Sequence, residues 1–234
     1  MRFGKVRVRR LAFVSRRHRA KARIERKIDR MKIALETIET KWIGISELMQ
    51  HRGGLANPLD VHARKIKALS SKRKKTDEDY IDLARAEFEG SLYFDERFGP
   101  VVPTDNILAT LVNGAKKSKY GREAGLAIFI ESVPKKGDAG VIRLDYDGPR
   151  TIEQLWDGGT GKFVSSKLVN VNRARIMRTR PIFPAGWSLH FLVRYDSSVI
   201  NSDSVIKAMQ DAGFYIGLAE WRPRYGRFEV EIVQ

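Results

Sequence analysis

The sequence predicts an α+β protein built on an antiparallel β-sheet with helical insertions and a basic N-terminal arm. Residues 187–196 alternate between apolar and polar side chains, as in a strand with one buried face. Residues 227–233 repeat this alternation, and residues 201–212 between them have apolar side chains at helical spacing. A strand, a helix and a strand in this order form half of a ferredoxin-like fold, so we predict a modified ferredoxin-like sheet.

The positive charge of the chain is concentrated at its N-terminus. Residues 1–30 hold thirteen Lys or Arg residues and two acids, a net charge of +11 out of +16 for all 234 residues. Such an arm either folds on contact with nucleic acid or is an extension upstream of a start at Met31. We expect residues 31–234 to form a single elaborated domain, with a loop-rich excursion at residues 134–168.

The first half of that domain has clear start signals for its elements. Residues 32–43 alternate and are rich in β-branched side chains, which predicts a strand. Pro58 is expected to begin a short helix, and Thr76 to cap a second one whose first turn is acidic. Between them lies a run of four cations, which is either a solvated surface or a clamp on a phosphate backbone. The run is Lys72, Arg73, Lys74 and Lys75.

The middle of the chain alternates between expected helix and expected strands. Pro103 and Thr104 mark the start of a helix, and Lys116 and Lys117 follow its end. Short apolar runs bounded by glycine, proline or lysine predict the strands of this region. They are expected at residues 90–98, at 126–130 as a buried strand, and at 141–146 and 162–165.

Four arginines lie in the extended segment of residues 169–180. Because side chains alternate along a strand, Arg173 and Arg175 share one face and Arg178 and Arg180 share the other. At least one of these pairs is therefore expected on an exposed surface, where arginine binds phosphate well.

Residues 212–228 combine glycines, aromatics and arginines, and we take this stretch as the centre of a binding site. Glycine allows a close backbone approach, arginine binds phosphate, and flat rings stack on bases. The alternative is a helix that ends at Gly213 and a loop whose Trp and Tyr plug the core. The residues expected to contact nucleic acid are Trp221, Arg222, Arg224, Tyr225 and Arg227, with Gly213, Gly217 and Gly226 shaping the loop.

Several kinds of chemistry have no support in the sequence. There is no cysteine, and the four histidines, His18, His51, His62 and His190, are not at metal-ligand spacing with one another. No phosphate-binding loop or catalytic set stands out. We therefore predict no catalytic residues, no metal and no cofactor, and a protein that is not an enzyme. No apolar run is long enough for a membrane span, so we expect a cytoplasmic protein without a membrane partner.

Two short segments carry a resemblance to a known group of proteins. The run Gly213-Phe214-Tyr215-Ile216-Gly217-Leu218, followed by Arg224-Tyr225-Gly226-Arg227-Phe228, resembles the C-terminal glycine-rich loop of the RAMP superfamily of CRISPR backbone proteins and nucleases. Residues 99–107 with residues 115–117 look like an element of the backbone proteins of that superfamily, and the order of elements is similar to that of uncharacterised tailed-phage proteins. The resemblance implies an RRM-like sheet, single-stranded nucleic acid binding and head-to-tail assembly, inside a bacterial host cell if a phage encodes the chain.

The sequence thus favours a non-catalytic, largely sequence-independent protein that binds single-stranded RNA or DNA and forms a homo-oligomer or filament on it. Two alternatives stay open. One is an endoribonuclease of the RAMP type, although its usual histidine has no evident counterpart. The other is a phage protein that acts through protein contacts, as an inhibitor or assembly factor. The choice between DNA and RNA depends on contacts with the 2′-hydroxyl, which the sequence does not reveal.

Overall fold

The structure is a computed structural model, and it describes residues 33–133, 140–171 and 173–233. Contacts divide the chain into two units, Met1–Ala34 and Leu35–Gln234, and every described helix and strand lies in the second unit. The arm predicted for residues 1–30 lies outside the described residues.

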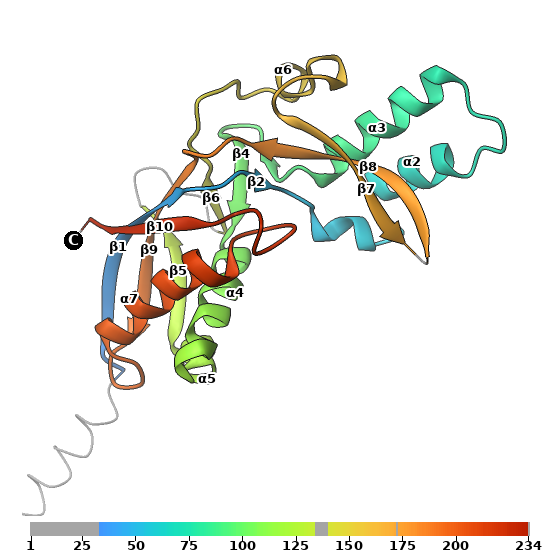
Figure 1. Cartoon of the computed structure of the whole chain (residues 1–234). Coiled ribbons are helices and arrows are strands. Elements are labelled where there is room, and N and C mark those ends of the chain that lie inside the picture. Colours follow the sequence, from blue (N-terminus) through green and yellow to red (C-terminus); the bar gives the residue numbers. More distant parts are fainter. Residues whose placement is uncertain (1–32, 134–139, 172, 234) are drawn as a thin grey trace, which may run out of the picture. The chain divides into compact units, whose positions relative to one another are not determined.

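The elements of the second unit are labelled in Figure 1. The strands are β1 (Leu35–Gly44), β2 (Leu48–Met49), β3 (Phe94–Asp95), β4 (Gly99–Pro103), β5 (Ile128–Ser132), β6 (Val141–Arg143), β7 (Val164–Val171), β8 (Ala174–Phe183), β9 (Ser188–Asp196) and β10 (Phe228–Ile232). The helices are α2 (Val61–Ser70), α3 (Asp77–Ser91), α4 (Thr104–Ala115), α5 (Gly121–Ala127), α6 (Ile152–Trp156) and α7 (Ser202–Asp211). Short turns are η1 (Gly53–Ala56), η2 (Lys116–Ser118), η3 (Asp157–Gly159) and the π-helical η4 (Ala212–Ile216).

The central sheet has four strands in the order β10-β1-β9-β5, and every neighbouring pair is antiparallel. This confirms the α+β class, the antiparallel sheet and the strands expected at both ends of the domain. The register places Trp42 of β1 opposite Leu189 of β9 and Val230 of β10. Strand β1 begins at Leu35, three residues later than the sequence pattern predicts.

One face of this sheet is buried beneath α4 and α7 (Figure 1). Trp42 stacks on Phe228 with ring centroids 4.0 Å apart and meets Phe191 edge-on at 5.0 Å. The two helices touch at Gly114, where a side chain would overlap the backbone of α7. Burial of these rings and helix faces supplies the hydrophobic stabilisation of the unit.

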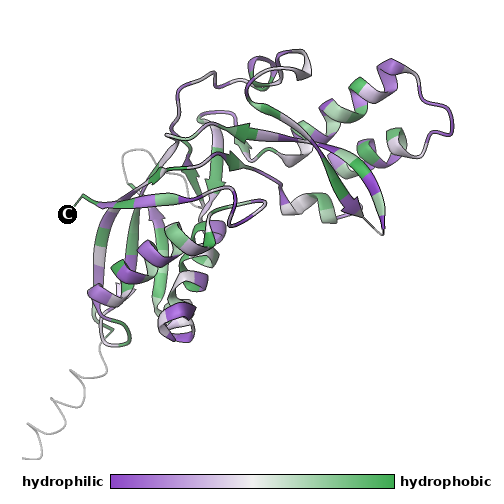
Figure 2. Ribbon diagram, in the orientation of Figure 1, coloured by the Kyte–Doolittle hydropathy of each residue, from purple (hydrophilic) through white to green (hydrophobic). Residues whose placement is uncertain are grey.

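A second, smaller group of elements carries most of the residues discussed below. Strands β7 and β8 form a long antiparallel hairpin, and β2 adds to β8. Helix α3 packs on β8, and its start carries the expected cap, because Thr76 and Asp79 bond each other's backbone N–H. The turn between α2 and α3 is hydrophilic throughout (Figure 2), as expected for a segment that holds the run of four cations.

Several local predictions are wrong. Residues 126–130 are not a buried strand: α5 continues to Ala127, β5 begins at Ile128, and Leu126 and Phe129 are exposed. The physical reason is that the antiparallel sheet has only one covered face, so alternate residues of β5 point to its uncovered side. The strand expected from residue 90 is displaced, because α3 continues to Ser91.

The glycine-rich stretch and the excursion also depart from expectation. The helix does not end at Gly213, since η4 continues the turn to Ile216 and Gly217 ends it with φ of 77°. Within the excursion, Leu144, Trp156 and Phe163 are buried in the main core. The described part of residues 134–168 is therefore rich in loops but contributes side chains to the core; residues 134–139 lie outside the described residues.

Candidate functional site

A cavity of about 840 Å³ opens between the β7–β8 hairpin, the segment from His51 through α2, and the loop after η4. Cations form much of its wall, together with two glutamates and one aromatic ring. These residues are Arg52, Lys67, Arg178, Arg180, Glu87, Glu220 and Trp221. The structure thus brings together three of the predicted contact residues, Arg178, Arg180 and Trp221, from two separate segments.

Arg178 and Arg180 are held in place by carboxylates from other elements. Arg178 forms an ion pair with Glu87 of α3, and the second oxygen of Glu87 accepts a hydrogen bond from the Thr179 N–H at 2.8 Å. The Glu87 side chain is 7% exposed, so the pair is largely shielded on that side. Arg180 lies 3.3 Å from Glu220. Each guanidinium has five N–H donors and uses only part of them on its carboxylate, which leaves donors for a phosphate.

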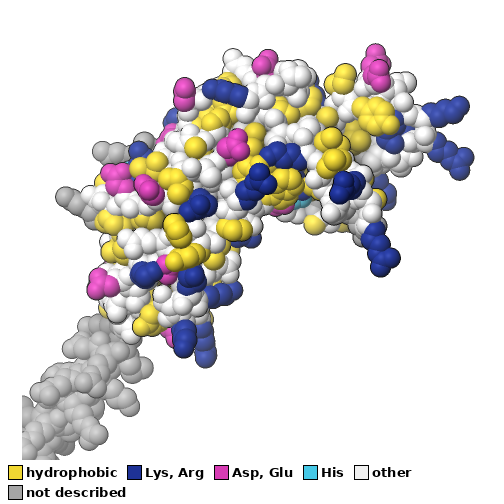
Figure 3. All heavy atoms as spheres, in the orientation of Figure 1, with side chains coloured by type: hydrophobic (Ala, Val, Ile, Leu, Met, Phe, Trp, Pro, Cys, Tyr) yellow, Lys and Arg dark blue, Asp and Glu magenta, His cyan; other side chains and the backbone are white. Residues whose placement is uncertain are grey.

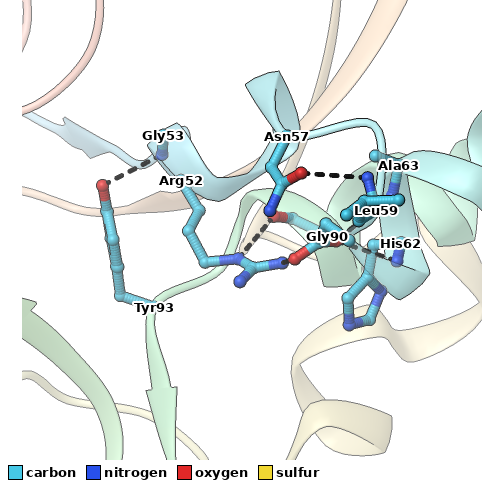
Figure 4. A network of polar contacts seen from close by, with 9 residues as sticks. Arg52, Gly53, Asn57, Leu59, His62, Ala63, Gly90 and Tyr93 are labelled. Carbon is cyan, nitrogen blue, oxygen red and sulfur yellow. Dashed lines mark hydrogen bonds and ion pairs between the residues drawn. The ribbon is translucent and has the colours of Figure 1, made fainter.

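Arg52 also lines the cavity, although it was not predicted as a site residue. Hydrogen bonds from its guanidinium group to neighbouring residues hold the side chain in place (Figure 4). Its Nε donates to the carbonyl of Gly90 at 3.1 Å, and its terminal nitrogen donates to Asp60 at 2.9 Å. Asp60 also caps α2 by accepting from the N–H groups of His62 and Ala63. Arg52 has no other Lys or Arg near it in the sequence, so no local pattern marks it. Lys67 follows Arg64 and Lys65, a short basic group that was not predicted as part of a site.

His51 faces the two arginines of β8 in the same cavity. Its Nδ1 lies 3.3 Å from the hydroxyl of Ser91. Burial lowers the pKa of the His51 imidazole, and the positive charges of Arg180 and Arg178 lower it further against the opposing effect of Glu220. The ring is therefore neutral at pH 7, in a wall that holds four cations and the carboxylates of Glu87 and Glu220.

Replacing Arg180 by glutamine is expected to raise the pKa of His51 toward its ordinary value of about 6.5. The substitution removes a positive charge that disfavours the imidazolium form. An NMR titration of the imidazole protons, assigned with a His51→Gln variant, measures the change. Arg97→Gln, on a distant exposed turn, serves as the control. A pKa of His51 that stays unchanged in Arg180→Gln would contradict the described arrangement.

The two aromatics of the loop after η4 have different surroundings. Tyr225 is 5% exposed and packs on Met49 and Ile182. Its hydroxyl contacts the amino group of Lys167, which also lies 4.6 Å from the ring centroid. Trp221 is half-buried, lines the cavity and adopts φ of 56°, a left-handed conformation that bulky residues rarely adopt. Tyr225 is thus a core residue, whereas Trp221 presents part of its ring to the cavity.

The three glycines of this stretch are explained by contacts within the chain. A side chain at Gly213 would overlap the carbonyl oxygen of Phe228, and one at Gly217 would lie 2.6 Å from that of Tyr225. At Gly226 it would overlap the backbone of Leu218, and φ is 72°. The glycines therefore close the loop on itself and on β10, and no approach of a ligand is needed to account for them.

The other predicted cations lie around the cavity or away from it. Arg173 and Arg175 are exposed at the tip of the hairpin, and Arg173 lies in the turn with φ of 69° and not in the strand. None of the run Lys72–Lys75 lines the cavity; Lys72 lies 2.5 Å from Asp79. Arg222 and Arg224 are exposed next to Trp221. On the face of the molecule drawn in Figure 3, Lys and Arg side chains lie beside hydrophobic ones.

Lys116, Lys117 and Arg227 gather around a different feature, the exposed rings of η4. Lys116 lines a shallow hollow of about 480 Å³ together with Tyr215 and Arg222. Lys117 lies over Tyr215, and Arg227 lies over Phe214. The structure therefore does not gather the predicted contact residues into one site. Some line the cavity and some surround η4, while others lie at the hairpin tip, in the run Lys72–Lys75 or, like Tyr225, in the core.

The uncovered face of the central sheet does not resemble a surface for nucleic acid. Its charged residues include four glutamates against one lysine and one arginine, and its charges are partly paired. The glutamates are Glu39, Glu131, Glu229 and Glu231. His190 lies 2.7 Å from Glu39, and Arg194 lies 3.0 Å from Glu131. An acidic face repels phosphate, so the sheet itself is an unfavourable platform.

Within the described ranges, no cluster of three or more His, Asp or Glu residues is arranged to hold a metal ion. Likewise, none of the described helices is both long enough and apolar enough to cross a membrane. Comparison with known proteins found no matching family model and no matching curated protein.

Proposed function

We propose that this protein binds single-stranded nucleic acid, RNA or DNA, in the cavity between the β7–β8 hairpin and the loop after η4. The observation that carries the proposal is the partly exposed ring of Trp221 in a wall shared with Arg178 and Arg180. Unpaired bases stack on such a ring, and the guanidinium N–H groups that Glu87 and Glu220 do not use donate to the adjoining phosphates. Contacts of these two kinds do not read base edges, so binding would depend little on sequence.

The order of elements around the central sheet supports a modified ferredoxin-like fold as part of the proposal. Strand β1, helix α4, strands β5 and β9, helix α7 and strand β10 follow the β-α-β-β-α-β order of that fold. A relation to the RAMP superfamily, a phage origin and head-to-tail assembly along the strand are further parts of the proposal. They rest on the glycine-rich segment, on residues 99–107 with residues 115–117 and on the order of elements, and not on the cavity.

A mobility-shift titration with single-stranded DNA, single-stranded RNA and duplex of equal length, at two salt concentrations, tests the proposal. We expect both single strands to be retained more strongly than the duplex, because paired bases cannot stack on Trp221. Retention should weaken at the higher salt concentration. Equal binding to all three would point to charge alone, and no binding to any of them would contradict the proposal and favour action through protein contacts.

The double variant Arg173→Ala with Arg175→Ala is expected to weaken binding and flatten its salt dependence without lowering the melting temperature. Both side chains are exposed at the hairpin tip, so the fold does not need them. Each lost phosphate contact changes the slope of log K against log salt by about 0.7 for a single strand. Arg64→Ala with Lys65→Ala, on exposed positions of α2, serves as a charge-matched control. An unchanged slope would exclude the hairpin tip from the binding surface.

His51 favours a second candidate function, an endoribonuclease. A neutral imidazole beside two arginines could accept the proton of an RNA 2′-hydroxyl while the arginines stabilise the charge that develops on the phosphate. Incubation with labelled RNA tests this candidate. Cleavage that is lost in His51→Ala while binding persists would favour the endoribonuclease. RNA that stays intact with the wild-type protein would contradict it, and the binding function would remain as the only proposal.

A further inference from the structure

The π-helical turn η4 presents two adjacent aromatic rings to solvent. Phe214 is 57% and Tyr215 is 49% exposed, and their centroids lie 4.7 Å apart with ring planes at 81°. Gly213 lets the turn lie directly on β10, and Gly217 ends the turn immediately afterwards. Because Ala212 and Gly213 are buried on the other side of the turn, the rings of Phe214 and Tyr215 point to solvent. Single π-helical turns of this kind are frequent at functional sites.

Cations that have no carboxylate partner surround these rings. The amino nitrogen of Lys117 lies 3.5 Å from the centroid of Tyr215, and the guanidinium carbon of Arg227 lies 4.8 Å from that of Phe214. Among the described residues, neither cation forms an ion pair, unlike Arg178 and Arg180 in the cavity. Both rings remain about half exposed with the cations in place, so ring and charge are presented together.

A shallow hollow of about 480 Å³ adjoins the rings. Its wall contains no acidic residue and consists of Asn113, Lys116, Tyr215, Ile216, Arg222 and Pro223. The amino group of Lys116 donates to Asn113 at 2.8 Å, and among the residues that the structure describes it has no carboxylate partner. An occupant of this hollow would meet the ring of Tyr215 together with the positive charges of Lys116 and Arg222.

Consecutive residues connect this hollow to the cavity. Trp221 lines the cavity, and the next residue, Arg222, lines the hollow. The left-handed conformation of Trp221 turns the chain at this point. A strand that leaves Trp221 therefore meets Arg222 and then the rings of η4, with no acidic residue in the wall of the hollow to repel it.

We infer that Phe214 and Tyr215 form a second base-stacking site for single-stranded nucleic acid, in which Lys116, Lys117, Arg222 and Arg227 neutralise the phosphates. The inference rests on the proposed function and adds to it, because a strand would occupy two sites joined by the Trp221–Arg222 step. Short strands fill the cavity alone, and longer strands reach η4. The combination of flat rings with uncompensated cations favours nucleic acid over an apolar protein partner.

The test compares oligothymidylates of ~6 and ~20 nucleotides, lengths that bracket common site sizes for single-strand binders. The variant is Phe214→Ala with Tyr215→Ala, and the control is Tyr80→Ala, a 58% exposed tyrosine on α3. Quenching of tryptophan fluorescence by a bound strand reports the cavity, because Trp42, Trp156 and Trp187 are buried and a strand can contact only Trp221. Anisotropy of a labelled strand gives the affinity.

We expect the double variant to lose about five- to a hundredfold in affinity for the long strand, the effect of losing one stacked base. Affinity for the short strand and the quenching of Trp221 should not change, and Tyr80→Ala should resemble the wild type. Lys117→Gln with Arg222→Gln, which keeps both rings, should flatten the salt dependence for the long strand only. This second variant tests the site even if the first melts early.

The outcomes separate the inference from the proposed function. If the wild type binds both strands and neither variant changes the affinity for the long one, the second site is overturned while the cavity proposal stands. If the wild type binds neither strand, both fail. If the two η4 variants instead lose binding to vesicles of anionic phospholipid while binding to the long strand is kept, the rings serve a membrane surface and the inference is wrong.

Discussion

Replacing Gly226 by valine is expected to prevent stable folding, and not merely to weaken binding. Gly226 has φ of 72°, where a β-branched residue is a marked outlier, and its new side chain would overlap the backbone of Leu218. Two backbone hydrogen bonds hold it there: its N–H donates to Glu47 at 2.7 Å, and its carbonyl accepts from Leu218 at 2.8 Å. Backbone strain and overpacking of about 1–3 kcal/mol each take a large share of a typical stability of about 5–15 kcal/mol.

Thermal unfolding followed by circular dichroism measures this effect, with Gly125→Ala as the control. Gly125 lies in α5 and its nearest neighbour would be Val112 at 4.0 Å, so alanine fits there. We expect the control to melt at or slightly above the wild-type temperature, because alanine favours a helix over glycine. Gly226→Val should be insoluble or melt about 10 °C lower. A Gly226→Val protein that melts normally but does not bind would show instead that this glycine makes room for a ligand.

The parts of the fold that the sequence predicts are those with local signals. Alternation along residues 187–196 identifies β9, because every second side chain enters one continuous core. Thr76 and Asn201 mark the starts of α3 and α7, because a capping side chain bonds a backbone N–H three residues later. Periods and caps are properties of neighbouring residues, so one sequence suffices to find them.

The parts that fail depend on contacts between distant residues. The sequence does not show that β5 would have one uncovered face, so the apolar run at residues 126–130 suggests more burial than there is. It also suggests that the glycines of residues 212–228 serve a ligand, whereas Gly213 and Gly226 are required by Phe228 and Leu218. Packing of this kind is decided by the tertiary structure and leaves no periodic trace.

The candidate site shows the same division. Composition indicates that arginines and aromatics matter in two segments, and Arg178, Arg180 and Trp221 do meet in one cavity. Their carboxylate partners could not be predicted, because Glu87 and Arg178 are 91 residues apart in the chain. The exposure of the Phe214 ring could not be predicted either, since an aromatic side chain after a helix is more often buried than presented to solvent.

Alanine substitutions at Trp221 and Tyr225 are expected to lower different quantities, the affinity for single strands and the stability of the fold, although the two ring centroids lie only 5.9 Å apart. Trp221→Ala should lower affinity for single strands by about 1–3 kcal/mol, roughly a five- to hundredfold change, with a small effect on stability. Tyr225→Ala should cost about 3 kcal/mol of unfolding free energy, because it empties the space between Met49 and Ile182. The difference follows from exposure, since only Trp221 presents its ring to the cavity.

Two conservative variants separate these contributions. One distinguishes the buried ring of Tyr225 from its hydroxyl, and the other tests how much stacking surface the site at Trp221 needs. Tyr225→Phe keeps the buried ring and removes only the contact with Lys167, so it should cost about 1 kcal/mol. Trp221→Phe keeps a smaller stacking surface and should retain part of the affinity. Melting temperature and affinity are measured on the same preparations of all four proteins. If Trp221→Ala has a lowered melting temperature and its folded fraction binds with unchanged affinity, Trp221 is a packing residue of the core like Tyr225. The strand would then have to bind elsewhere, and the Arg173→Ala with Arg175→Ala variant tests the hairpin tip as that surface.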